Sequence, residues 1–567
     1  MQKFTRLMIV VAMLVMAISL TQAQDDNFVH VSLATSDIPS IDPSIGTDTH
    51  SIQYTSSLMP GLTIIDEVTS ETKPGMATWT VSDDGLTYTF SITPDVPWVK
   101  YNAETGAVEE VMVDGAVRYV TAEDFIYGMT RSMDPRTGSY YGGILASWVE
   151  GGSAFNGATA DAADDASDED LAAMVEPMME GLALTAVDDY TLEVVAPQPA
   201  GFLSQLLGMW MSTAQPGWLV DEFGDAWAEP ENVISYGPFA LQEWLRGESA
   251  TMVKNPFWPG TEGIPVAQID GVVDTFLDPN AALVNYEAGT LDSVGVPGAE
   301  LDRVLADATL NAEYSTSPGT CTFYLAMNTT KAPTDDIRVR QAIAQSLNRQ
   351  LLIDGVLGGV GEPAYFFARP ELAGAATIDS HPEVALQEDA EAAAAKLEEY
   401  VSEGNELPVL SYGTTTSESS ALIAAALAEM WSDALEGFEM EIQQQEWAVF
   451  LETTDVEETA PNIWRLGWCL DYPDAHNFLF DVFHSSVIDN GTGFRSEEFD
   501  SLLEEAQAMT DNAARAELYA RAEEILTNEV AALIPYQYNQ SSRLVKPYID
   551  RPLGASVTQF ELWTINN

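Results

Sequence analysis

Runs in which apolar and polar residues alternate recur along this chain and predict β-strands. The first is the stretch 29–35, VHVSLAT, whose period of two is typical of a strand with one buried face. The stretch 79–92, WTVSDDGLTYTFSI, holds two such runs around Asp83-Asp84-Gly85, so it predicts a hairpin with glycine at the turn. The same pattern predicts further strands within residues 182–195, 234–258, 321–327 and 544–567.

Segments with helical spacing lie between these strands. Thr121, three residues before Asp124, is an N-cap signal for the helix that follows it. A longer helix is expected from Asp335 or Asp336 to about Val356. Four more helices are predicted over about 386–402, 417–435, 496–509 and 512–528. Because strands alternate with helices throughout, without an internal repeat or a long linker, the predicted fold class is α/β.

The first residues have the pattern of a secretory signal peptide. Lys3 and Arg6 give a positive start, and residues 7–20 form an apolar run too short to span a bilayer. Small residues at 21–23 offer a cleavage site after Ala23, so the signal is assigned to residues 1–23. No cysteine follows the apolar run, so no lipoprotein anchor is expected. The mature chain is therefore expected in the periplasm or at the cell surface.

The length of the chain limits the number of domains, and its net charge limits the kinds of partner. Removing the signal leaves 567 − 23 = 544 residues, enough for about three domains. The chain has 23 lysines and arginines against 88 aspartates and glutamates, a formal net charge of −65. Such a charge repels nucleic acid and anionic membranes. Two explanations of the acidity stay open, namely saline surroundings that screen the repulsion or a lineage whose proteins are acidic.

Motifs of reaction centres are missing from the sequence. It holds no GxSxG, HExxH, CxxC or P-loop pattern, and its five histidines are scattered. A catalytic site would need a nucleophile with a base, or a set of metal ligands. We therefore expect no enzyme, no metal site and no cofactor.

The densest group of unusual residues surrounds the segment 467–474, GWCLDYPD. Asp471 is a loop acid among aromatic residues, which suits a small, partly charged ligand, although a solvated loop acid would look the same. The two cysteines of the chain are Cys469, in this segment, and Cys321. Export and an even count favour a disulfide between them, with two buried free thiols as the alternative.

Six segments of the chain together resemble a known family. They are WTVSDDGLTYTFSI, TAEDF, SYGPFALQEW with KNPFW, YLAMNTTKAPTDDIRVRQAI, GWCLDYPD and SSRLVKPY, and they occur in the order that the family has. The sequence resembles the extracytoplasmic solute-binding proteins of the peptide/nickel ABC-importer family (solute-binding protein family 5). It is nearest to the oligopeptide-binding members, and the likeness runs over nearly the whole mature chain.

The resemblance implies a periplasmic-binding-protein type II-like fold. This fold has two lobes that close about a hinge, and an additional inserted domain. The expected division is a signal peptide (1–23), a discontinuous domain I (24–60, 215–320 and 536–567), an inserted domain II (61–214) and a domain III (321–535).

The resemblance also implies roles for single residues. Asp471 would pair with the free α-amino group of a peptide, and Arg465 would meet its terminal carboxylate. Gly467 and Cys469 would bond an extended peptide through their backbone, as an added strand does. The remaining matches are aromatic pocket positions (Tyr141, Tyr324, Trp447 and Trp468) and a disulfide pair (Cys321 and Cys469).

The function expected from the resemblance is capture of oligopeptides or dipeptides for an ABC importer. The partners would be a peptide ligand and the membrane permease, and the protein would be a monomer that binds no nucleic acid. Other readings are a non-peptide solute such as an oligosaccharide or metal chelate, a peptide sensor or chaperone without a transporter, and a secreted hydrolase.

The chain also departs from the pattern of the oligopeptide binders. A second arginine expected some nine residues before Arg465 is missing, and residues 456–458 occupy that region. Ala326 and Gly319 stand where enteric oligopeptide binders have an acid and a tyrosine, and residues 101–120 form an insertion. These differences leave the preferred length and sequence of the peptide open.

Overall fold

The computed structural model describes residues 27–66, 71–160, 162–163, 166–486, 491–509, 511–554 and 558–566. The predicted signal peptide, residues 1–23, lies outside these ranges. Among the described residues, no helix has both the length and the apolar character needed to cross a membrane.

A large mixed sheet runs through the molecule. Among the described residues it has 11 strands, ten of them in the order β12-β13-β14-β1-β15-β21-β16-β20-β18-β19, with β17 pairing beside β21. Strand β1 is parallel to β14 and β15, and β18 is parallel to β19 and β20. The strand bounds are β1 (Phe28–Ser32), β12 (Phe239–Leu245), β13 (Ser249–Lys254), β14 (Gly271–Thr275), β15 (Ser293–Gly295), β16 (Tyr314–Met327), β17 (Glu362–Pro363), β18 (Leu410–Thr415), β19 (Met440–Gln445), β20 (Ile463–Cys469) and β21 (Leu533–Val545).

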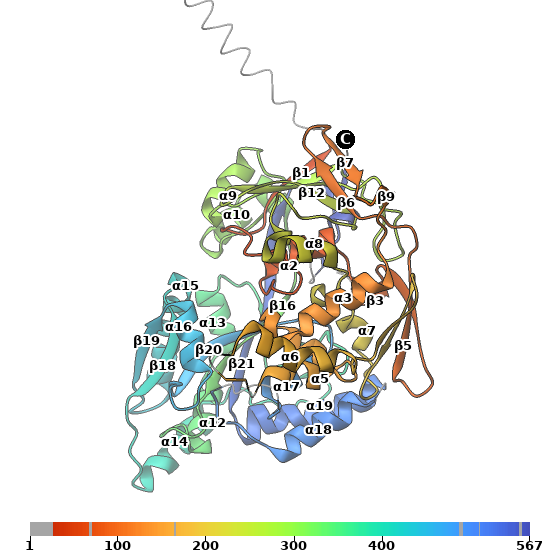
Figure 1. Cartoon of the computed structure of the whole chain (residues 1–567). Coiled ribbons are helices and arrows are strands. Elements are labelled where there is room, and N and C mark those ends of the chain that lie inside the picture. The colour runs from red at the N-terminus through yellow and green to blue at the C-terminus, as the bar shows by residue number, and fades with distance from the viewer. Residues whose placement is uncertain are drawn as a thin grey trace, which may run out of the picture.

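Two long strands, β16 and β21, join the two halves of this sheet. Figure 1 shows β1 and β12 at one end of the molecule and β18 and β19 at the other, with β16 and β21 between them. The β16–β21 pairing has a register shift between Pro318 and Thr322. The domain limits expected at residues 321 and 536 fall inside these two strands. Each strand therefore continues from one proposed domain into another.

A smaller sheet lies beside the large one. Its strands are β4 (Ala77–Val81), β5 (Thr87–Ile92), β10 (Leu184–Asp188) and β11 (Thr191–Val195), in the order β10-β11-β5-β4. The predicted hairpin is the antiparallel pair β4–β5, and Gly85 has a φ of 75° in its turn. Helix α3 (Ala122–Met133) has Thr121 as its N-cap, and the Thr121 backbone N–H donates to the Asp124 carboxylate at 2.9 Å.

One hydrophobic core holds the smaller sheet and the first half of the large one together. It extends from Val29 on β1 to Phe90 on β5 and Phe125 on α3. The other strands and helices of this part of the molecule are β2 (Thr63–Ile65), β3 (Thr72–Pro74), α2 (Thr49–Leu58), α4 (Gly142–Ser147), α5 (Gly152–Asn156), α6 (Asp168–Met179), α7 (Leu203–Leu206) and α8 (Gly217–Phe223). The 101–120 insertion and the two residues before it form two ribbons, β6 (Val99–Asn102) with β7 (Ala107–Glu110) and β8 (Met112–Val113) with β9 (Ala116–Val117).

The single helix predicted to reach Val356 is wrong, because the chain forms two helices there. Helix α12 (Ile337–Gln345) has the predicted cap Asp336, whereas α13 (Arg349–Val356) starts afresh. The Asn348 side chain accepts the backbone N–H of Leu351 at 2.8 Å and so caps the second helix. Leu351 is 55% exposed and does not belong to one continuous apolar face.

The remaining predicted helices form close to their expected bounds. They are α14 (Ala390–Ser402), α15 (Glu418–Ala434), α18 (Glu497–Gln507) and α19 (Asn512–Glu524). Sequence patterns missed α16 (Trp447–Thr454), α17 (Ala475–Phe483) and the helices α9 (Pro279–Glu287), α10 (Leu301–Ala306) and α11 (Ala308–Glu313). The strand expected over 544–567 is mostly absent from the described residues there, which hold only β22 (Ile549–Asp550) and β23 (Thr564–Ile565) after β21 ends.

Candidate functional site

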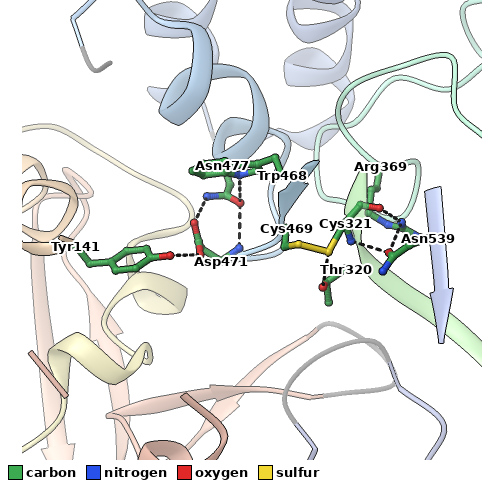
Figure 2. The surroundings of a disulfide bond; sticks show 9 residues. All are labelled: Tyr141, Thr320, Cys321, Arg369, Trp468, Cys469, Asp471, Asn477 and Asn539. Carbon is green, nitrogen blue, oxygen red and sulfur yellow. Dashed lines mark hydrogen bonds between the residues drawn. A yellow bond between two sulfur atoms is a disulfide. The ribbon is translucent and has the colours of Figure 1, made fainter. Parts of the chain in front are cut away.

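The site is built on the antiparallel strand pair β16–β20. Cys321 and Cys469 face each other in its register and form a disulfide, the pairing that the resemblance implied. The link closes a separation of 148 residues, so it fixes two distant segments side by side. Around it, the Arg369 guanidinium donates to the Cys321 carbonyl oxygen at 2.9 Å, and the Asn539 side chain accepts the Cys321 backbone N–H at 2.8 Å (Figure 2).

The second edge of β20 is largely free of strand partners. Within the described residues, β18 pairs with β20 only at Ile463 and Trp464. At the ends of the β16 pairing, the Leu470 N–H donates to Thr320 and the Asn462 carbonyl accepts from Asn328. Because backbone bonds of an antiparallel strand alternate in direction, the even-numbered residues bond to β16. The odd-numbered residues Arg465, Gly467 and Cys469 therefore direct their N–H and C=O groups to the open edge.

Gly467 is required at its position by packing. A Cβ built there would lie 2.6 Å from Cδ1 of Phe323, its direct neighbour on β16. Any larger residue would displace that ring or the strand. The glycine also leaves the open edge of β20 without a side chain at its centre.

Asp471 follows β20 directly and lies in the loop before α17. Figure 2 shows its carboxylate between Asn477 and Tyr141. Asn477 Nδ2 donates to Asp471 Oδ2 at 3.1 Å, and the Tyr141 hydroxyl donates to Oδ1 at 3.3 Å. Both donors are neutral, and no ion pair to this carboxylate exists among the described residues. The Asp471 carboxylate thus has partners that hold it but none that neutralises it.

The surroundings of Asp471 disfavour its charge. Burial raises its pKa to about 6, while the hydrogen bonds from Asn477 and Tyr141 act in the opposite direction. The residue as a whole is nevertheless only partly buried. The carboxylate is therefore surrounded by protein, in a residue that still reaches the surface.

Tyr141 comes from a distant part of the chain, 330 residues before Asp471. It stands at the N-cap of α4, and its ring makes edge-to-face contacts with Tyr140 and Trp210 at centroid distances of 5.2 and 4.9 Å. Tyr140 is 66% exposed, yet burial and the charges of Asp455 and Asp471 raise its pKa. The two predicted residues Tyr141 and Asp471 are thus brought together.

Arg465 lies on the other face of β20 from Trp468. Its Nε donates to the Tyr536 hydroxyl at 2.6 Å, and its guanidinium lies 4.5 Å from the centroid of the Phe323 ring. Among the described residues it forms no ion pair with a carboxylate, so the two terminal nitrogens remain available for an anion. Trp468 is partly buried beside Asp471 and donates its indole N–H to Asn477 at 3.2 Å.

The other two predicted aromatic positions have contrasting environments. Tyr324 is only 3% exposed and packs edge-to-face against Phe367 and Phe483. Trp447 is 56% exposed at the start of α16 and stacks on Phe450. Neither residue contacts Asp471 through a described hydrogen bond, and their roles as pocket residues stay predictions.

Sequence reasoning missed the polar groups behind Asp471. On α17, Asn477 Nδ2 donates to Asp481 Oδ2 at 3.0 Å, and both residues are buried. Phe202, from the segment after β11, stacks on Tyr472 and His476 at 5.2 and 4.5 Å. The one available signal was Asp474 as a cap for α17, whose side chain accepts the His476 N–H at 2.9 Å. Such a helix would turn Asn477 toward the loop.

Together these features define a binding protein. Two halves share two long strands, an uncovered strand edge ends at a partly buried acid, and aromatic side chains stand beside it. The described residues hold no group of three or more histidine, cysteine, aspartate or glutamate side chains placed to bind a metal ion.

Comparison with known proteins gives the family. Residues 71–490 match the model described as bacterial extracellular solute-binding proteins, family 5 Middle, and the chain belongs to this family. Family 5 proteins are solute-binding components of ABC importers, so this chain is a binding protein and not an enzyme.

Individual relatives agree over nearly their whole length. The chain is 29% identical to the periplasmic oligopeptide-binding protein OppA of Salmonella typhimurium, over 91% of this chain and 88% of the relative. It is 28% identical, over 91% and 88%, to the probable deoxycholate-binding periplasmic protein YgiS of Escherichia coli. The solved structure of the E. coli murein tripeptide binding protein MppA covers 96% of this chain and 99% of its own, with a TM-score of 0.74 at 24% identity, which shows the shared fold.

Proposed function

We propose that this protein captures short peptides with a free α-amino group and delivers them to the permease of an ABC importer. The observation that carries the proposal is Asp471, a carboxylate held by neutral donors at the end of an open strand edge. A peptide supplies what both features lack, because it has an ammonium for the acid and a backbone for the strand.

The proposed arrangement places the peptide along β20. Its N-terminal ammonium pairs with Asp471, and its main chain bonds to the outward backbone groups of Arg465, Gly467 and Cys469. Arg465 offers its free guanidinium nitrogens to the terminal carboxylate or to an acidic side chain. Tyr141 reaches Asp471 from a segment outside domain III, so a bound peptide touches more than one proposed domain and favours closure of the lobes.

The location of the protein in the cell follows from the same proposal. The family is extracellular, and the sequence predicts export by a signal peptide over residues 1–23. We assign the mature protein to the periplasm or the cell surface, as a monomer.

A non-peptide solute is the second candidate, and one relative gives it weight. A protein named as a probable deoxycholate binder is 28% identical to this chain, so family membership alone does not fix the ligand. A bile acid is an anion, and its carboxylate would be repelled by a charged Asp471. A neutral oligosaccharide would leave Asp471 without a cation.

The ligand that co-purifies with the protein decides between these candidates. The protein is purified without denaturation and then unfolded, and the released small molecules are identified by mass spectrometry. We expect a set of short peptides with unmodified N-termini. Release of an oligosaccharide, a metal chelate or a sterol acid, with no binding of peptides to the stripped and refolded protein, would contradict the proposal.

A further inference from the structure

Asn477 makes four hydrogen bonds around Asp471, and they use its whole capacity. Its Oδ1 accepts the indole N–H of Trp468 at 3.2 Å and the backbone N–H of Asp471 at 3.0 Å. Its Nδ2 donates to Asp471 Oδ2 at 3.1 Å and to Asp481 Oδ2 at 3.0 Å. A carboxamide has two donor hydrogens and one oxygen with two lone pairs, so every position is filled. Figure 2 shows Asn477 with its partners Trp468 and Asp471.

This pattern allows only one orientation of the carboxamide. Exchanging its oxygen and nitrogen would point N–H groups at two donors and the oxygen at two carboxylates. The Asn477 side chain is fully buried in the first turns of α17, where it cannot rotate into solvent. The helix therefore presents one fixed N–H group to Asp471.

Asp481 anchors the carboxamide from behind, one helical turn after Asn477. Its Oδ2 also lies 2.7 Å from the Tyr472 hydroxyl, which in turn lies 2.8 Å from His476 Nδ1. All three of these side chains are buried. The second N–H of Asn477 is thus tied to a rigid polar cluster, and the first is left for Asp471.

We propose that Asn477 is a positioning residue for ligand binding, which holds Oδ2 of Asp471 and leaves Oδ1 facing the ligand's ammonium. The assignment rests on the proposed function. At Oδ1, the only described hydrogen bond is the 3.3 Å contact from Tyr141, which is longer than a usual O–H···O hydrogen bond, so an ammonium can share or displace it.

The hydrogen bond from Asn477 also favours the charged form of Asp471. The titratable groups around it are Tyr140 and Tyr141 on the α4 side, Asp481 and His476 on α17, and the Asp474–Arg515 ion pair. Burial lowers the pKa of His476 to about 3 and raises that of Asp481 to about 7. His476 is therefore neutral and supplies no positive charge, so the N–H of Asn477 is a main support for the charged form of Asp471.

The test compares Asn477→Leu with a control of similar burial, Gln507→Leu. Among the described residues, the Gln507 side chain has a hydrogen bond with His476 Nε2, at 3.1 Å, and none with Asp471. Binding of trialanine and of N-acetyl-trialanine is measured by calorimetry between pH 4.5 and 8. Because a hydrogen bond to a charged group is lost, we expect Asn477→Leu to weaken trialanine binding about ten- to a hundredfold and to leave the acetylated peptide unaffected.

The pH profile separates positioning from a structural role. Removing the Asn477 N–H raises the pKa of Asp471 further, so the pH at which trialanine binding is half lost should move upward. Asn477→Asp, which adds an acid to the site, should move it further, and Gln507→Leu should not move it. Equal losses for both peptides with an unmoved midpoint would overturn the proposal.

A measurement on the unmodified protein covers the case in which the variants do not fold. The side-chain amide signals of Asn477, observed by NMR in the empty protein, should show a titration step near pH 6 from Asp471, besides the step near pH 7 from Asp481, and should shift when trialanine is added. Signals that lack the step near pH 6, or that keep it in Asp471→Asn, would overturn the inference. If no peptide binds but these signals titrate, the proposed function fails while Asn477 still holds Asp471.

Discussion

Asp471 and Asp474 lie three residues apart in one loop and meet opposite environments. Asp474 forms a two-pronged ion pair with Arg515, at 2.7 and 2.5 Å, and both side chains are 3% exposed. It also caps α17 by accepting the His476 N–H. Asp471 receives only neutral donors and is only partly buried.

The difference separates a structural acid from a binding acid. A buried carboxylate is tolerated when the fold supplies its cation, and Arg515 does so for Asp474. For Asp471 the fold supplies position without a counter-charge. We infer that the missing cation is the ligand's, so the energetic cost of burying Asp471 is recovered only on binding.

The largest expected effect is on the free energy of unfolding. It is expected when Asp474 is replaced by asparagine, and the same replacement of Asp471 is the comparison. Asp474→Asn leaves Arg515 buried without its partner, which should lower the free energy of unfolding by about 3–5 kcal/mol. Asp471→Asn keeps one acceptor, for the Asn477 N–H, and replaces the other oxygen by an NH2 group that can donate to the Tyr141 hydroxyl. Because it also removes an unpaired buried charge, it should leave the free energy of unfolding unchanged or raise it. Urea denaturation of the empty proteins measures both.

Equal losses in the two variants would show that Asp471 is also a structural acid. A stabilised Asp471→Asn protein would strengthen the comparison, since it would mean that the native site is strained for the sake of binding.

The next effect is a pH dependence that only Asp471 should produce. Its folded pKa of about 6 lies above the ordinary value of 3.8, so its contribution to the stability of the empty protein is full below pH 3.8 and is lost as pH rises through 6. Peptide binding has the opposite sign, because it needs the charged form. Affinity for trialanine should fall about tenfold per pH unit below 6, and again above about 8 as the peptide's amine loses its proton.

Calorimetry across this pH range is done on the unmodified protein and on Asp471→Asn. The difference between their affinities for trialanine isolates the titration of Asp471. The buried acid Glu523 titrates in both proteins and cancels in the difference. Asp481 does not cancel fully, because the charge of Asp471 raises its pKa. A difference between the two proteins that does not vary from pH 4.5 to 7 would contradict the assigned charge state.

A smaller effect is expected from the hydrogen bond that the Tyr141 hydroxyl donates to Asp471. Tyr141→Phe removes one hydroxyl donor at 3.3 Å and preserves the ring contacts with Tyr140 and Trp210. Loss of one weak hydrogen bond should weaken trialanine binding by about 1 kcal/mol, or about fivefold. Binding a hundredfold weaker in equilibrium titrations would mean that Tyr141 touches the ligand directly.

Local patterns in the sequence predicted several elements of the fold. The β4–β5 hairpin, the α3 cap at Thr121 and the strand that carries Cys321 all follow from short-range signals. Asp471 was identified because family segments and aromatic neighbours surround it in the chain. The three-domain division at residues such as 321 and 536 stays a prediction.

What the sequence could not show depends on side chains that meet only in the folded protein. Asn477 gains its role because α17 turns it under Asp471, and Asp474 gains its role because α19 carries Arg515 to it. A 9-residue apolar helix such as α17 is also hard to distinguish from a strand by periodicity. The break between α12 and α13 was missed because Asn348 reads as an ordinary polar position until its side chain caps a helix.

The most direct test of the central claim is a calorimetric comparison of two peptides on two proteins. Trialanine and N-acetyl-trialanine are titrated into the unmodified protein and into Asp471→Asn at pH 7. If Asp471 lacks a cation that the ligand supplies, the substitution should cost trialanine about 3–5 kcal/mol and should leave the acetylated peptide unchanged. Tight binding of trialanine to Asp471→Asn, at the affinity of the unmodified protein, would contradict the account.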